Sequence, residues 1–62
     1  MDEVDRFVSS TGNTIVLRTD GIRWEVANCD PDGSHVWVET SVDMSHPFTE
    51  DSARAEFERW RV

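Results

Sequence analysis

The sequence predicts an α+β domain in which an antiparallel meander sheet of three or four strands packs on one C-terminal helix. From residue 14 to residue 42, apolar and polar side chains alternate, which is the period of half-buried strands. Over residues 50–61 the apolar spacing changes to that of a helix. The 62 residues are expected to form one domain, residues 1–62, with room for one thin core and for no large pocket.

Three strands are predicted in the middle of the chain, over about residues 14–19, 22–29 and 34–42. Because successive side chains of a strand point to opposite faces, the alternation gives each strand one apolar face. The helix is expected to lie across the sheet face that carries Ile15, Leu17, Trp24, Val26 and Val38, and Ile22, Val36 and Val42 follow the same alternation.

The first two strands are joined by Asp-Gly at residues 20–21. This dipeptide suits a two-residue type I′ turn, because both of its central residues need positive φ. Such a turn sets Leu17 opposite Trp24 and Ile15 opposite Val26, so the apolar faces of the two strands match.

The stretch NCDPDGSHVWVE, residues 28–39, offers oxygen ligands at the spacing of a calcium-binding loop. Calcium loops of that kind lie between helices, whereas both flanks here alternate like strands, so a hairpin is the preferred interpretation. The tetrapeptide DPDG, residues 30–33, suits a type I turn followed by a left-handed glycine. The resulting three-residue loop sets Val38 opposite Val26.

This register places Trp37 on the outer face, the sheet face away from the helix. A shift of one residue would turn Trp37 inward and bring Val36 and Val38 out. Because that shift exchanges two buried valines for one tryptophan, we expect Trp37 to lie outside.

Cys29 is the single cysteine, so the fold needs no disulfide and no oxidising compartment. The predicted register sets Cys29 opposite His35, and His46 or an aspartate would have to complete a zinc site there. The C-x-x-C spacing of zinc motifs is missing, so we expect a free thiol beside a surface histidine. A Cys-His nucleophile would also need an orienting group and an oxyanion pocket. The sequence therefore predicts no metal, no cofactor and no enzymatic activity.

The helix is predicted over about residues 50–61, with Thr49 as its N-cap. Its buried stripe would consist of Ala53, Phe57 and Trp60, at the spacing i, i+4 and i+7. The other features of a stable helix are Glu50 and Asp51 in the first turn, Arg59 and Arg61 in the last, a Glu50–Arg54 pair, and Phe48 packed against Ala53.

The N-terminal segment has two interpretations. Residues 4–9 could form a further edge strand, or Val4, Phe7 and Val8 could share one side of a short helical turn. In either case Phe7 or Val8 could fold over the outer face and make it a second small core.

Thirteen Asp and Glu stand against six Arg and no Lys, giving a formal net charge of −7. Direct binding to nucleic acid is disfavoured, because phosphate contacts need clustered cations. The acidity fits a basic partner, ordinary solubility or the solvated surface of a halophile. The N-terminus has no signal-peptide pattern and no segment is long enough to span a membrane, so we expect a soluble, cytoplasmic protein.

The outer face is the predicted binding surface, with Trp37 as an aromatic anchor among carboxylates. Such a surface suits a basic protein partner. The residues assigned to it are Glu25, Trp37, Glu39, Asp43, Asp2, Glu3 and Asp5.

Residues 22–60, with Trp-x-Val, DPDG and F-T-E-x-S-A-x-x-x-F-x-R-W, loosely resemble the arm-type DNA-binding domains of phage integrases. That resemblance implies DNA binding by basic residues of the sheet, at positions where this chain has Glu25, Glu39 and His35 beside Arg23. A regulatory or DNA-binding domain using Arg18, Arg23 and the arginines of the helix end is the alternative function.

In size and charge the chain also looks like small acidic phage-encoded inhibitors of host defence, such as anti-CRISPR proteins and other DNA mimics. This likeness implies a non-enzymatic inhibitor in which carboxylates stand in for phosphates. The expected partner is a basic nucleic-acid-binding protein or complex, such as a CRISPR effector. This protein would bind it as a monomer or homodimer in the host cytoplasm.

Overall fold

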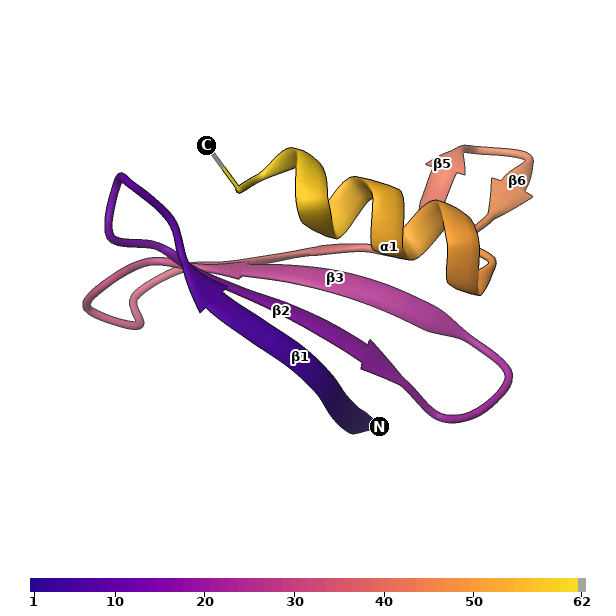
Figure 1. The fold of residues 1–62 in the computed structure, drawn as a ribbon, viewed down its shortest axis with the longest axis horizontal. Coiled ribbons are helices and arrows are strands. Elements are labelled where there is room, and N and C mark those ends of the chain that lie inside the picture. The colour runs from indigo at the N-terminus through magenta and orange to yellow at the C-terminus, as the bar shows by residue number, and fades with distance from the viewer. Residues whose placement is uncertain (62) are drawn as a thin grey trace.

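Four antiparallel strands in the order β1-β2-β3-β4 form a sheet, and one C-terminal helix covers one of its faces (Figure 1). The structure, a computed structural model, describes residues 1–61, and residue 62 of the predicted domain lies outside them. The elements are β1 (Asp2–Val8), β2 (Thr14–Thr19), β3 (Trp24–Cys29), β4 (Val36–Glu39), β5 (Ser41–Asp43), β6 (His46–Pro47) and α1 (Glu50–Arg59). The predicted fold class is confirmed, with four strands in the main sheet.

The core lies between α1 and the two central strands. Ile15 and Leu17 of β2 and Val26 of β3 are fully buried under the helix, because they occupy alternate positions on one face. The core cluster is Ile15, Leu17, Val26, Phe48, Ala53 and Phe57, with Phe7, Trp24 and Trp60 packed against it. Of the five sheet residues expected under the helix, only Val38 lies elsewhere.

The helix begins where the sequence predicts. Thr49 is the N-cap, and its side chain and that of Ser52 form a reciprocal capping box. Glu50 and Arg54 form the expected pair, 2.9 Å apart. The helix ends at Arg59, two residues before the predicted end, because the Trp60 N–H donates to Phe57 O and tightens the last turn.

The N-terminal segment is a strand, not a helical turn. β1 pairs along β2 and adds a further strand at the edge of the sheet, so it does not cover the outer face. Its Phe7 lies opposite Ile15 and packs edge-on against Phe57, with ring centroids 5.0 Å apart. β1 therefore adds to the one core under α1.

The predicted turn between β2 and β3 is wrong by two residues. Ile15 pairs with Asn28 instead of Val26, and a four-residue loop, residues 20–23, replaces the type I′ turn. The Asp20 carboxylate accepts hydrogen bonds from the Ile22 and Arg23 N–H groups, which holds the wider loop closed. A shift of two keeps every face unchanged, but it leaves Ile22 outside the strand and 87% exposed.

The predicted register between β3 and β4 is wrong by one residue. Val26 pairs with Glu39 and Asn28 with Trp37, and the Asp30 N–H donates to His35 O across a four-residue loop. The type I turn and left-handed Gly33 are present. However, the Asp32 carboxylate accepts the Ser34 N–H, at 2.9 Å, and keeps Ser34 within the loop.

A shift of one residue exchanges the two faces of β4. Trp37 and Glu39 therefore point to the helix side, and Val36 and Val38 lie on the outer face, where they are 54% and 46% exposed. Exposing the two valines is unfavourable. The side-chain hydrogen bonds that fix the length of the loop compensate for this exposure.

The predicted long strand 34–42 is broken at Thr40. β4 ends at Glu39, and the following β5 pairs with β6 in a separate two-stranded sheet on the helix side (Figure 1). Residues 44–47, between the predicted strand and the helix, therefore contain the short strand β6. The Phe48 N–H donates to Thr40 O and returns the chain to the start of α1.

Candidate functional site

The outer face does not carry the predicted acidic surface. Of the residues assigned to it, Glu3 and Glu25 lie there, one on each side of Arg18. Glu25 is paired with Arg18 at 2.6 Å, and Glu3 accepts a 2.8 Å hydrogen bond from Arg6, which lowers the pKa of Glu3. Two glutamates and two arginines give this face no net charge.

The other predicted residues lie away from the outer face. Asp2 and Asp5 occupy the β1 edge, at positions that share the helix side with Leu17. Asp43 lies in the β5–β6 hairpin, where hydrogen bonds from His46 and Ser45 lower its pKa. Trp37 and Glu39 remain together, two residues apart on the helix side of β4.

Cys29 and His35 do not face each other, because Cys29 pairs with Val36. The His35 ring instead lies 3.2 Å from the Asp30 carboxylate and stacks on the Trp37 ring, with centroids 6.0 Å apart. Among residues 1–61, no group of three His, Cys, Asp or Glu side chains is placed to hold a metal ion. The prediction that Cys29 lies opposite His35 is thus wrong, because it depended on the incorrect β3–β4 register.

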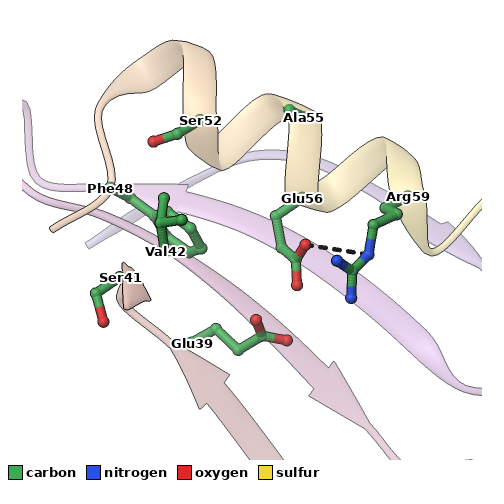
Figure 2. A pocket seen from close by; sticks show the side chains of 8 residues that line it. All are labelled: Glu39, Ser41, Val42, Phe48, Ser52, Ala55, Glu56 and Arg59. Carbon is green, nitrogen blue, oxygen red and sulfur yellow. Dashed lines mark ion pairs between the residues drawn. The ribbon is translucent and has the colours of Figure 1, made fainter. Parts of the chain in front are cut away.

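A cleft of about 480 Å³ separates β4 and β5 from α1, and we call it the Glu39 cleft (Figure 2). It is lined by Glu39, Ser41, Val42, Phe48, Ser52, Ala55, Glu56 and Arg59. Figure 2 shows the Glu39 side chain rising from the sheet toward Glu56, which descends from the helix. The Arg59 guanidinium lies 3.4 Å from the Glu56 carboxylate, so this cleft holds two carboxyl groups and one internal cation.

The position of Glu39 between strand and helix raises its pKa to about 6. Burial is the largest cause, and the hydrogen bond and negative charge of Glu56 act in the same direction. Arg59 and the Trp60 indole oppose the rise. The Trp60 Nε1–H is nevertheless buried without a partner at normal hydrogen-bond geometry, so its interaction with Glu39 is weak.

A second, smaller hollow of about 420 Å³ adjoins the first at Glu39, and we call it the Trp groove. Its lining residues are Asn28, Trp37, Val38, Glu39 and Trp60. Trp37, on the edge strand β4, is 58% exposed. Two indoles and one carboxyl group thus meet at an open edge of the sheet.

Sequence reasoning missed Glu56 as a site residue and read Trp60 only as core. A signal was present, since Glu56 stands next to Phe57 and four positions before Trp60, on the flank of the buried stripe. The sequence does not show which strand faces that flank of the helix, because this depends on the β3–β4 register.

The arginines are largely occupied within the chain. Arg6, Arg18, Arg54, Arg59 and Arg61 each form an ion pair with a glutamate, which leaves Arg23 as the arginine of residues 1–61 without one. The excess of carboxylates therefore sets the long-range field of the molecule.

Comparisons with protein-family models, curated proteins and solved structures found no match for this chain. Within residues 1–61, α1 is too short and too polar to cross a membrane.

Proposed function

We propose that this protein is a non-enzymatic, acidic inhibitor that docks on a basic, nucleic-acid-binding surface of a partner. The observation that carries the proposal is the pairing of the arginines. With five of six already held by glutamates, the chain has few free cations for phosphates but many carboxylates for a basic surface.

Trp37 would be the central anchor residue of this acidic docking surface. A half-exposed tryptophan beside a carboxylate is the kind of residue that dominates binding energy at protein interfaces. The docking surface in this proposal is therefore Trp37, Glu39 and the rim of the Trp groove, on the helix side of β4. The class of partner is a defence complex or nuclease, such as a CRISPR effector, whose nucleic-acid site would be blocked.

The alternative function, a DNA-binding domain of the integrase-arm type, is weakened by the same pairing. Arg18, Arg54, Arg59 and Arg61 would each have to leave a glutamate to reach a phosphate. The outer sheet face would also bring Glu3 and Glu25 to the DNA.

Capture from a bacterial lysate containing CRISPR effectors and nucleases tests the proposal. We expect the immobilised protein to retain basic nucleic-acid-binding proteins, and excess duplex DNA to displace them. Glu39→Lys should weaken capture strongly, and Glu50→Gln, on the exposed side of α1, should change it little. Retention of DNA by the protein itself, or capture that DNA does not displace, would contradict the proposed function.

A further inference from the structure

We infer that the Trp groove receives an arginine side chain of the partner, with its guanidinium against the indoles and paired with the Glu39 carboxylate. This inference rests on the proposed function and specifies which chemical group of a basic partner is recognised. Three features support it: aromatic rings elsewhere in the fold that are covered by arginines, the absence of an ion pair at Glu39 within residues 1–61, and the residues that line the groove.

Two other aromatic rings of the chain, those of Phe7 and Trp24, are covered by its own arginines. The Arg61 guanidinium lies 4.3 Å from the centre of the Phe7 ring, and that of Arg54 lies 5.8 Å from the centre of the Trp24 ring. Both are cation–π contacts. Within the described residues no arginine covers Trp37, which is more exposed and has only the His35 ring stacked on it.

Glu39 supplies the charge that a cation would need at the end of the groove. Glu56 is paired with Arg59, whereas Glu39 has no ion pair among residues 1–61. Burial and the neighbouring Glu56 carboxylate both oppose its ionisation. A cation from the partner would stabilise the ionised Glu39 carboxylate. Without such a cation, the negative charge at the end of the groove is not balanced by an ion pair.

Arginine fits this groove better than lysine does. A guanidinium is planar, stacks on aromatic faces and donates in a fork that matches a carboxylate, whereas an ammonium is a compact and strongly hydrated point charge. The side chains on the helix side of this lining, two indoles, the Asn28 amide and one carboxyl group, offer a stacking surface and a single anionic end. We therefore assign an arginine side chain, and not a lysine, to the groove.

A titration with a small peptide tests the inference without the partner. The probe is an acetylated Gly-Arg-Gly amide added to the whole chain, and the readout is the NMR shift of the three tryptophan indole N–H groups. We expect saturable shifts at Trp37 and Trp60, little change at Trp24, and a Kd of about 1 mM or weaker, as for a single side chain.

Glu39→Gln should weaken this binding by about tenfold, and the charge-matched control Glu50→Gln should leave it unchanged. The lysine peptide should bind severalfold more weakly. Absence of shifts at Trp37 and Trp60, equal binding by Glu39→Gln, or equal binding of the lysine peptide would each overturn the assignment of arginine to the groove.

Binding should also weaken as the pH falls through about 6, where Glu39 takes up a proton. Glu56 and Arg59 from α1 are the other titratable or charged groups beside it, and His35, in the loop before β4, stacks on Trp37. The Glu39→Gln variant keeps these other groups unchanged and so isolates the contribution of Glu39. Its binding should lose most of the pH dependence, and an unchanged profile would contradict the role of Glu39.

The two proposals fail in different ways. If basic proteins are captured and displaced by DNA but the arginine peptide does not bind, the groove assignment is wrong and the proposed function stands. If the peptide binds with the expected variant pattern but no basic protein is captured, the proposed function is wrong while the arginine site stands.

Discussion

The environment of Glu39 in the fold disfavours the ionised form of its carboxyl group. This carboxyl group lies between β4 and α1, where burial and Glu56 raise its pKa above the ordinary value of 4.5 to about 6. The folded protein therefore holds the proton of Glu39 more tightly than the unfolded chain does. Between these two pKa values stability must fall as the pH rises.

Glu39→Gln is accordingly expected to stabilise the protein at about pH 7.5 by about 1 kcal/mol, because a neutral amide removes a charge that the cleft disfavours. That figure is reduced from the full pKa shift because the cleft is open to solvent. The gain should shrink to near zero below about pH 4.5, where the wild-type carboxyl is protonated in both states.

Urea unfolding of both proteins across this pH range measures the difference. Glu50→Gln provides the control, with a small loss from its exposed pair with Arg54. A destabilised Glu39→Gln at neutral pH, or a difference that does not vary with pH, would contradict the environment assigned to Glu39. Stabilisation combined with weaker peptide binding would separate the binding role of this residue from any role in folding.

At the scale of elements, local rules identified the helix and strands, but they did not fix the strand registers. The N-cap at Thr49 and the stripe of Ala53, Phe57 and Trp60 follow from short-range sequence patterns. The predicted hairpin registers are wrong because the side chains of Asp20 and Asp32 accept hydrogen bonds from backbone N–H groups, which lengthens both loops. Turn residues predicted that a turn would form and left its length undetermined.

The β3–β4 register can be tested by disulfide formation with the natural Cys29. In the structure Cys29 faces Val36 in a non-hydrogen-bonded pair, next to the Asp30–His35 bond, so the two Cα atoms should lie within disulfide range. We expect Val36→Cys to form an intramolecular disulfide under mild oxidation.

His35→Cys serves as the control, because the register predicted from the turn would pair that residue with Cys29. Its side chain lies on the opposite face of β4, so no intramolecular bridge should form in the native protein. Mass spectrometry after alkylation distinguishes the two variants. A bridge in His35→Cys with none in Val36→Cys would show that Trp37 and Glu39 point to the outer face.

At the scale of the whole molecule, the change from strand to helix periodicity predicted a small α+β fold, and the structure bears this out. Periodicity could not place the binding residues, since one residue of register decides whether Trp37 shares a face with Glu25 or with Trp60. The predicted pairing of Trp37 with Glu39 survives because residues two apart on a strand keep a common face under any shift.

The central claim is that this protein recognises basic protein segments and not nucleic acid. Fluorescence anisotropy of a labelled arginine-rich peptide and of a labelled duplex DNA, each at about 150 mM salt, tests it most directly. We predict that the protein binds the peptide, that Trp37→Ala and Glu39→Gln weaken binding and Glu50→Gln does not, and that the duplex stays free. Binding of the duplex, or of neither probe, would contradict the claim.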